Sequence, residues 1–383
     1  MDKPTVQDIF HRFYPAYLDH YSPSPVQAKV AHNIMNCKTG AYGANVCVCE
    51  DCGFVQIHYN SCRNRCCPMC QAVPKEMWMD ARREDVLDAP YFHLVFTVPD
   101  ILNPVIYSNQ RLLYDALYHA ASSTISELTA DPKHLGAKLG YICILHTWGS
   151  EMIFHPHIHT ILLGGGLASN NQWKDNGENF FLPIRVISKM FRGKYLEELK
   201  RLWEEDKLVF HGTAEKFRNH YTFKELLDSC YGMDWIPHCK KTFNGAQTVI
   251  KYLGKYTHRI AVSNHRIVRM DDDTVTFLVK DYRNEGQWKE LTISGVEFVR
   301  RFLMHVPPRR FVRIRHYGLL CSRTKSQKLT LCRNLLGCKK YLSKLRDMEM
   351  PEILEHLYGI KVCVCKACGG HLGKPQMRMP LRC

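Results

Sequence analysis

The chain has 383 residues, which is enough for two or three domains with one sizeable core. Lys and Arg outnumber Asp and Glu by 52 to 37, so the formal net charge at pH 7 is +15 and a polyanionic partner such as nucleic acid is expected. No apolar run approaches the roughly 18 residues of a membrane span, and no signal-peptide core is found, which argues against a membrane or secreted protein. We therefore expect a soluble protein of the cytoplasm.

Cysteine clusters dominate the N-terminal part of the chain. In a reducing compartment, clustered thiolates are typical of zinc ligands rather than of disulfides. A helix is predicted from Pro25, with Ser24 before it, to about Met35. A run of cysteines follows this helix: Cys37, Cys47, Cys49, Cys52, Cys62, Cys66, Cys67 and Cys70.

Two Cys-x-x-Cys pairs in this run have the spacing of zinc knuckles. We predict a structural Zn²⁺ whose ligands are Cys49, Cys52, Cys67 and Cys70. Of the other thiols, Cys37, Cys62 and Cys66, with His58, either close a second site or are buried as small apolar side chains. The module either grips DNA or only folds a small subdomain.

Helices and strands are predicted to alternate through the middle of the chain. In order, we expect a helix over 72–88, a strand over 91–98, a helix over 109–128, strands over 141–148 and around His157, a helix over 187–206, a strand over 234–243, a helix from about 245, and a β-meander over 266–270, 274–280 and 288–293. The strand around His157 is expected to form an antiparallel hairpin with 141–148 and to stop at Gly164. No internal repeat and no low-complexity tract are expected.

His157 and His159 flank one apolar residue on a predicted strand. Side chains two positions apart point to the same face, so both imidazoles can hold one ion; the alternative is a histidine-rich strand face in solvent. Catalytic metal sites usually have three protein ligands and leave positions open for substrate and water. His146, on the other strand of the hairpin, is the predicted third ligand. The alternatives are His155, then Gln247 and Glu151.

Tyr252 and Tyr256 lie four residues apart on a predicted helix, so their phenols share one face. Alone, such a pair is more often a core or interface feature. Together with the histidine strand, it supplies a nucleophile beside a metal that polarises a phosphodiester. A free phenol has a pKa of about 10 and needs a base or a cationic neighbour. Lys255 and His258 are near in sequence, but neither is assigned this role.

The C-terminal part is strongly basic. Alternation over 311–317 places arginines on one face with aromatic rings, which suits a single-stranded backbone with stacked bases; the alternative is an ordinary solvated strand face. The predicted nucleic-acid-binding residues are Arg309, Arg310, Phe311, Arg313, Arg315 and Tyr317. A looser cluster, in which we expect a small zinc knob, consists of Cys363, Cys365, Cys368 and Cys383.

Four features together resemble rolling-circle insertion-sequence transposases of the HUH superfamily, family ninety-one. They are His157-Ile158-His159, Tyr252-x3-Tyr256, the cysteine-rich segment 61–71 and the basic segment 311–318. The resemblance runs from about residue 10 to about residue 340. It implies an α+β fold: an HUH nuclease core with a central antiparallel sheet and packed helices, plus an N-terminal Cys-rich zinc-binding module. It also implies Mg²⁺ or Mn²⁺ at the histidines, and Tyr252 and Tyr256 as nucleophiles that form a 5′-phosphotyrosine and free a 3′-hydroxyl.

We expect three regions: a helical zinc-binding module over 1–88, the tyrosine nuclease over 89–294, and a basic DNA-binding region with the small Cys cluster over 295–383. The expected activity is to nick and rejoin single-stranded DNA of element ends and targets in the bacterial cytoplasm, at the nucleoid. No Gly-x-x-x-x-Gly-Lys-Ser/Thr loop occurs, so a host helicase is expected to unwind the DNA. The alternatives are a plasmid relaxase or replication initiator with the same chemistry, or a non-enzymatic zinc-finger DNA-binding regulator.

Overall fold

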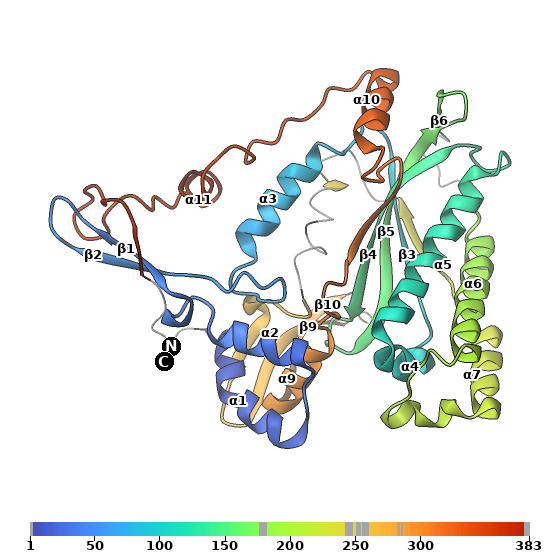
Figure 1. The fold of residues 1–383 in the computed structure, drawn as a ribbon, viewed down its shortest axis with the longest axis horizontal. Helices are drawn as coiled ribbons and strands as arrows, with labels where there is room; N and C mark the ends of the chain where they lie inside the picture. The colour runs from blue at the N-terminus through green and yellow to red at the C-terminus, as the bar shows by residue number, and fades with distance from the viewer. Residues whose placement is uncertain are drawn as a thin grey trace.

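The computed structural model describes residues 3–175, 182–241, 248–249, 254, 260–281, 284 and 286–378. Helices pack on antiparallel sheets, which confirms the predicted α+β class (Figure 1). No helix of the described residues is long and apolar enough to cross a membrane. Short 3-10 helices lie at η1 (Gly40–Tyr42), η2 (Asp100–Leu102), η3 (Gly212–Arg218) and η4 (Asn264–Arg266).

The central sheet has six strands in the order β11-β4-β5-β3-β7, with β6 pairing on β5. Their bounds are β3 (Tyr91–Thr97), β4 (Lys138–Trp148), β5 (Phe154–Leu167), β6 (Trp173–Asp175), β7 (His238–Lys241) and β11 (Ile314–Gly318). Each of these pairings is antiparallel, and β4 and β5 form the predicted hairpin. His146 lies directly opposite His157 in this hairpin.

Strand β5 continues through the glycine run, so its predicted end at Gly164 is wrong. A Cβ atom on Gly165 would lie 2.4 Å from the Trp173 ring, and one on Gly166 would lie 2.5 Å from the Lys138 carbonyl oxygen. The glycines therefore let β4 and β6 approach β5 closely, and they do not end the strand.

Helices cover one face of the central sheet (Figure 1). They are α4 (Asn103–Ser108), α5 (Gln110–Ala130), α6 (Ile184–Glu204) and α7 (His220–Gly232). The Phe96 ring of β3 packs 4.8 Å from the Phe191 ring of α6, and the Tyr118 hydroxyl of α5 accepts a hydrogen bond from the Leu145 amide of β4. Because side chains alternate along a strand, the residues next to these apolar ones point to the opposite face.

A second core joins the N-terminal helices to the segment 260–306. Helices α1 (Val6–His20) and α2 (Pro25–Met35) pack with α9 (Gly295–Met304) and the β10-β9-β8 sheet, whose strands are β8 (Ile267–Met270), β9 (Thr274–Asp281) and β10 (Gln287–Ser294). This sheet confirms the predicted meander. The Phe10 and Phe302 rings meet edge to face at 5.2 Å, and a Cβ on Gly295 would lie 2.2 Å from the Phe13 ring. This core therefore takes residues from all three expected regions.

A thin arm, which carries the β1–β2 hairpin of the N-terminal part, projects from the body that the two cores form (Figure 1). Its sheet has the order β12-β1-β2, from β1 (Ala44–Val48), β2 (Val55–Tyr59) and β12 (Gln376–Arg378). Helix α3 (Ala72–Arg83) leads back toward the central sheet, and the chain after α10 (Lys325–Leu336) runs along α3 through α11 (Met350–Tyr358) to the arm. Asp80 of α3 anchors this return by accepting hydrogen bonds from Tyr341, Ser343 and Leu345.

Candidate active site and metal centres

Three histidines converge on the face of the central sheet opposite α5 and α6. One ring nitrogen from each of His146, His157 and His159 lies within 4.8 Å of the others. The Nε2 atoms of His157 and His159 are 3.0 Å apart. Since His146 faces His157 across the ladder and His159 follows two residues later, all three project from the same face. The structure thus brings together the three histidines that the sequence singled out.

Neighbouring groups orient two of these imidazoles. His157 Nδ1 lies 2.7 Å from the carbonyl oxygen of His155, and a carbonyl only accepts, so His157 carries its proton on Nδ1 and keeps the Nε2 lone pair for a ligand. His159 Nδ1 lies 2.9 Å from His93 Nε2. Such contacts behind a metal-binding histidine fix its tautomer and ring orientation.

His93 was missed in the sequence. It lies on β3, where Val95 faces His159 and His93 faces Ile161, so it shares the histidine face. Alternation along β3 could have placed His93 and Val95 on the same strand face. The sequence did not show, however, that β3 pairs with β5, and so it did not bring His93 to the histidine face.

Burial keeps the central histidines neutral. Desolvation lowers the pKa of His157 to about 4 and holds the pKa of His159 well below its ordinary value of 6.5. A neutral imidazole is the form that binds a metal. The alternative ligand His155 instead lies near the surface, where its Nδ1 is 3.1 Å from the Asp100 carboxylate, and it is not among the three clustered histidines.

Tyr252 and Tyr256, with the candidates Gln247, Lys255 and His258, lie outside the described residues. Two described residues flank Tyr252. Val249 is buried and lines a small cavity with Ile142 and Ile161, which face each other on the histidine side of the β4–β5 pair. Gly254 meets α3, because a Cβ there would lie 1.9 Å from the Met79 sulfur.

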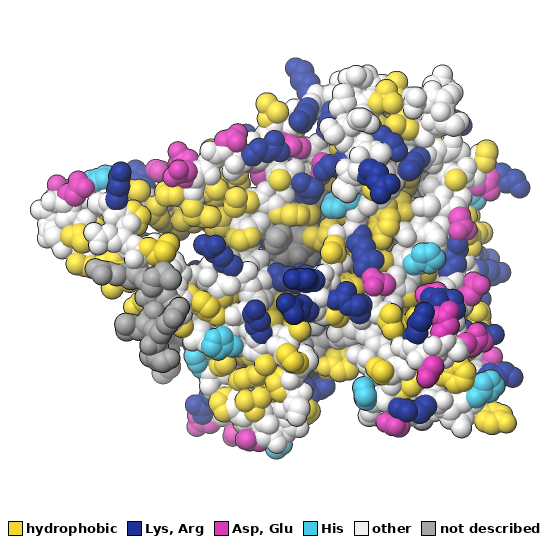
Figure 2. Space-filling view, viewed as in Figure 1, with side chains coloured by type: hydrophobic (Ala, Val, Ile, Leu, Met, Phe, Trp, Pro, Cys, Tyr) yellow, Lys and Arg dark blue, Asp and Glu magenta, His cyan; other side chains and the backbone are white. Residues whose placement is uncertain are grey.

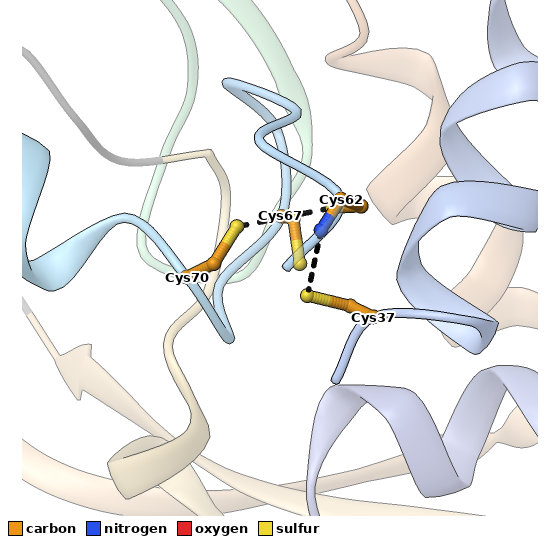
Figure 3. A group of neighbouring side chains, drawn as sticks. All are labelled: Cys37, Cys62, Cys67 and Cys70. Atoms are coloured by element: carbon orange, nitrogen blue, oxygen red, sulfur yellow. Dashed lines mark hydrogen bonds between the residues drawn. The ribbon is translucent and has the colours of Figure 1, made fainter. Parts of the chain in front are cut away.

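The first cysteine cluster lies between the end of α2 and the start of α3. The sulfurs of its four members, Cys37, Cys62, Cys67 and Cys70, point toward one another and lie within 4.8 Å (Figure 3). The Sγ atoms of Cys62 and Cys70 are 3.8 Å apart, and the Cys62 and Asn64 amides donate to Cys37 and Cys62 sulfurs. Hydrogen bonding with Cys62 lowers the pKa of Cys37 to about 7, which favours the thiolate that binds zinc.

The second cluster joins Cys49 and Cys52 to Cys365 and Cys368, again with all four sulfurs within 4.8 Å. The predicted tetrad of Cys49, Cys52, Cys67 and Cys70 is therefore corrected: the two pairs belong to different clusters. The reason is that the β1–β2 hairpin carries Cys49 and Cys52 out along the arm, away from the 61–71 segment. The expected C-terminal knob is corrected as well, since Cys365 and Cys368 are completed by the N-terminal pair; Cys383 lies outside the described residues.

The basic segment also differs from its prediction. Its strand, β11, is hydrogen-bonded to β4 at the edge of the central sheet. Phe311 is buried at 2% exposure, edge to face with Tyr114, so its ring cannot stack on a base. Arg315 pairs with Asp115 and lies 4.0 Å above the Tyr118 ring. The Tyr317 ring, partly buried, stacks on Tyr141. Helix α5 covers the face that was expected to be open to DNA.

Basic side chains instead line two neighbouring cavities. One, of about 430 Å³, is bordered by Arg65, Arg310 and Arg313 between α3 and β11. The other, of about 400 Å³, shares Arg65 and extends past Lys75 to Gly254. Figure 2 shows Lys and Arg side chains gathered in this middle part of the face, between the arm and the body. Arg309 and Arg310 are exposed nearby.

Known proteins match nearly the whole chain. A family described as "Transposase zinc-binding domain" matches residues 9–98, and one described as "Putative transposase" matches residues 140–328. The chain thus combines a transposase segment with an N-terminal zinc-binding domain. "Putative transposase y4qJ" of Sinorhizobium fredii (strain NBRC 101917 / NGR234) is 40% identical over 369 residues, 95% of this chain and 93% of the relative. The chain belongs to the IS91 family of insertion-sequence transposases.

A second relative is the "Transposase for insertion sequence element IS801" of Pseudomonas savastanoi pv. phaseolicola. It is 29% identical over 309 residues, 79% of this chain and 72% of the relative. Among solved structures, the conjugative relaxase TrwC in complex with OriT DNA, metal-free or metal-bound, aligns with 43% of this chain at 13% identity and a TM-score of 0.25. The alignment covers 71% of the metal-free relaxase chain and 70% of the metal-bound one. The transposase expectation is confirmed over the relaxase and regulator alternatives.

Proposed function

We propose that this transposase cleaves and rejoins single-stranded DNA of element ends and targets, with a divalent metal ion on His146, His157 and His159 and with Tyr252 and Tyr256 as nucleophiles. The observation that carries the proposal is the convergence of three buried imidazole groups on one sheet face. Of the described residues around the tyrosines, Val249 borders that face and Gly254 meets α3.

The three imidazoles fit a metal ion. Two ligands at right angles and about 2.1 Å from one ion are about 3.0 Å apart, which matches the 3.0 Å between the Nε2 atoms of His157 and His159. An ion held by these three nitrogens would keep its remaining coordination positions for substrate and water. We propose Mg²⁺ or Mn²⁺, as in the family, although nitrogen ligands also suit softer metals. When bound, the ion supplies Lewis-acid polarisation of a phosphodiester oxygen.

Tyr256 makes the first cut in this proposal, because its position matches that of the nucleophile shared with one-tyrosine relatives. Its phenolic oxygen attacks phosphorus, the bond from phosphorus to the 3′ oxygen breaks, and the phenolic proton passes to the departing oxygen. The products are a 5′-phosphotyrosine and a free 3′-hydroxyl. The positive charge of Arg65 and Lys75, which line the cavity at Gly254, favours ionisation of a nearby phenol.

Tyr252 gives a second covalent position one helical turn away. One tyrosine can hold a strand end while the other cuts or receives another strand, which permits strand transfer without release. The exposed Arg309 and Arg310, with Arg313 in the 430 Å³ cavity, bind the phosphates of the single strand and guide it along the two basic cavities. A host helicase unwinds the duplex.

Zinc has a structural role in the proposal. Cys37, Cys62, Cys67 and Cys70 are the ligand set assigned to the zinc-binding domain, since four thiols within 4.8 Å suit a tetrahedral Zn²⁺. The cluster ties the end of α2 to the loop before α3 and thereby fixes the wall that carries Arg65.

The test is a nicking assay on single-stranded oligonucleotides carrying the element ends, with Mg²⁺, with Mn²⁺ and with chelator. Mass spectrometry of the covalent adducts identifies the tyrosine. We expect Tyr256→Phe to abolish the first nick, and Tyr252→Phe to nick but fail to complete transposition in cells. Binding without cutting in either metal would refute the enzymatic proposal. Normal transposition by Tyr252→Phe would reduce Tyr252 to a packing residue.

A further inference from the structure

A seven-residue pattern occurs twice in the chain, near its two ends. Residues 47–53 and residues 363–369 both read Cys-Val-Cys-x-x-Cys-Gly. This internal repeat was overlooked in the sequence, because its copies are short and more than three hundred residues apart. The copies supply the two halves of the second cysteine cluster, Cys49 and Cys52 from one, Cys365 and Cys368 from the other.

The two copies have the same backbone conformation. In the first, the Gly53 amide donates to the Cys49 carbonyl at 3.0 Å and the Cys49 amide donates to Phe54 at 2.9 Å. In the second, the Gly369 amide donates to the Cys365 carbonyl at 3.0 Å and the Cys365 amide donates to Gly370 at 2.8 Å. Both glycines are left-handed, with φ of 71° and 77°, a conformation that side chains disfavour. Each copy is therefore a tight turn that presents two sulfurs to one point.

The distances between the turns suit a shared metal ion. Cys49 Sγ lies 3.5 Å from Cys368 Sγ, and Cys52 Sγ lies 3.8 Å from Cys365 Sγ. The sulfurs around a tetrahedral Zn²⁺ with bonds of about 2.3 Å are about 3.8 Å apart, whereas a disulfide bond is about 2.05 Å long. The Ala367 amide also donates to the Cys365 sulfur, a contact that supports a thiolate.

The apolar core around this cluster is too small to hold the two chain ends together. Among the described residues it consists of Cys47, Cys49, Cys365 and Leu372. Other apolar side chains of the hairpin, such as Val55 and Ile57, are about half exposed. The paired sulfurs join segments 319 and 313 residues apart, so their ordering carries a large entropic cost that this core does not offset. A metal–thiolate site supplies that missing free energy in small domains.

We propose that Cys49, Cys52, Cys365 and Cys368 form a second structural Zn²⁺ site, which closes the chain by fastening its C-terminal segment to the N-terminal hairpin. The proposal is independent of the nuclease chemistry. Backbone hydrogen bonds show how the two turns dock around the site: the Glu50 amide donates to His371, and the Gly373 amide donates to Val48. The zinc-binding domain is thus completed by residues outside the 9–98 segment that the family describes.

Metal counting tests the site on the full chain. Elemental analysis with native mass spectrometry is expected to find two zinc ions per wild-type chain, the other being on the Cys37 cluster. Cys365→Ser/Cys368→Ser is expected to lose one ion, Cys49→Ser/Cys52→Ser to lose one ion, and the four-residue combination still to lose only one. The matched control is Cys363→Ser, in the same repeat but outside the four ligands, which should keep both ions.

Retention of two ions by Cys365→Ser/Cys368→Ser would overturn the proposal, as would the loss of two ions in the combined variant while one ion is lost in each pair. Iron in place of zinc would overturn the metal assignment. If the variants fail to fold, alkylation of the unmutated protein tests the site independently. In the zinc-loaded chain, Cys52 and Cys368, although exposed, should resist alkylation while the exposed Cys321 reacts, and a chelator should remove this protection. Equal reactivity of Cys368 and Cys321 in the loaded chain would also overturn the site.

Discussion

The histidine cluster and the cysteine clusters are built in opposite ways. His146 and His157 face each other on adjacent strands of a hairpin, inside a sheet covered by α5 and α6. The cluster of Cys49, Cys52, Cys365 and Cys368 instead joins the two ends of the described chain with only a four-residue core around it, whereas the Cys37 cluster packs against the second core. The sheet therefore arranges the histidines without help from an ion, whereas the Cys49 cluster has little apolar packing to arrange its thiols when no metal is bound.

Because of this difference, we expect the loss of metal from the histidines and the loss of zinc from the cysteines to have different consequences. Removing the ion from the histidines should stop chemistry and leave the sheet folded, because hydrogen bonds and packing hold the imidazoles. Removing zinc from the cysteines should instead destabilise the segments that carry them, because four thiols within 4.8 Å of one another lose the ion that bonds them together. The first three predictions examine this separation directly.

The largest effect is expected at the histidine ligands. His157→Ala or His159→Ala should lower the nicking rate by more than roughly 100-fold, since even groups behind the ligands change activity by 10- to 100-fold. DNA binding and the thermal midpoint should stay close to those of the wild type. The matched control is His155→Ala, on the same strand but outside the cluster, which should keep the rate. Wild-type nicking by either ligand variant, or in chelator, would remove the metal from the mechanism.

The zinc ligands should show the opposite behaviour. Cys67→Ser/Cys70→Ser should lose one zinc and unfold the N-terminal module, measured by metal content and by protease sensitivity of residues 36–71. Cys66→Ser changes a neighbouring buried thiol that is not among the clustered ligands, and it should keep its zinc. An unchanged zinc content in the double variant would show that Cys67 and Cys70 are not ligands.

The contact behind His159 tests how far the sheet itself arranges the site. His93→Phe removes the hydrogen-bond partner of His159 Nδ1 and should lower the apparent metal affinity and the nicking rate by roughly 10- to 100-fold. His93→Gln can restore a hydrogen bond and should recover part of the loss. A titration of nicking against metal concentration measures the effect. If both variants lose activity equally with no change in metal dependence, His93 is a packing residue.

Local sequence signals predicted the elements whose causes are local. Helix α2 begins at Pro25 and ends at Met35 as predicted, because Ser24 and Gln27 form a capping box at its start. The hairpin of β4 and β5 also followed from pattern, and with it the choice of His146, because pairing two strands with histidines at their adjoining ends brings those residues together.

Long-range pairing could not be predicted in the same way. Spacing identifies Cys49 and Cys52 as one half of a zinc site, but any other pair in the chain could supply the second half. The repeated Cys-Val-Cys-x-x-Cys-Gly pattern, which was overlooked, is the sequence signal that could have paired them with Cys365 and Cys368. Phe311 was assigned to a free strand face, since its alternation is the same whether β11 stands alone or joins β4 under α5.

A buried histidine beside the active site gives the sheet a defined pH dependence. His305 donates from Nε2 to the Met152 carbonyl, and burial lowers its pKa from 6.5 to about 4. Between these values the unfolded chain binds a proton and the folded chain does not. The free energy of unfolding should therefore be level above pH 6.5 and fall as the pH drops from 6.5 toward 4, by up to about 1.4 kcal/mol per pH unit from this group.

Denaturant unfolding across that range, with zinc on the cysteine clusters and no metal on the histidines, measures the slope. His305→Gln should be less stable near neutral pH and have a shallower slope, whereas a substitution of the exposed His356 should leave the slope unchanged. An equal slope in His305→Gln would assign the pH dependence to other groups.

The smallest expected effect separates the two arginines of β11, which the sequence treated alike. Arg313 lines the basic cavity with Arg65, whereas Arg315 is paired with Asp115 and stacked on Tyr118. If the cavity is the path of the single strand, Arg313→Ala should flatten the plot of log affinity against log salt by roughly 0.7 for each phosphate that the variant no longer neutralises. Arg315→Ala should leave the slope unchanged, because its charge is already neutralised within the protein, although it should lower the thermal midpoint because its packing on Tyr118 is removed. Affinity for one oligonucleotide, measured at several salt concentrations, compares the two variants. The reverse result, with only Arg315→Ala changing the slope, would place the DNA on the α5 side of β11 and separate the strand's path from the cavity that reaches Gly254.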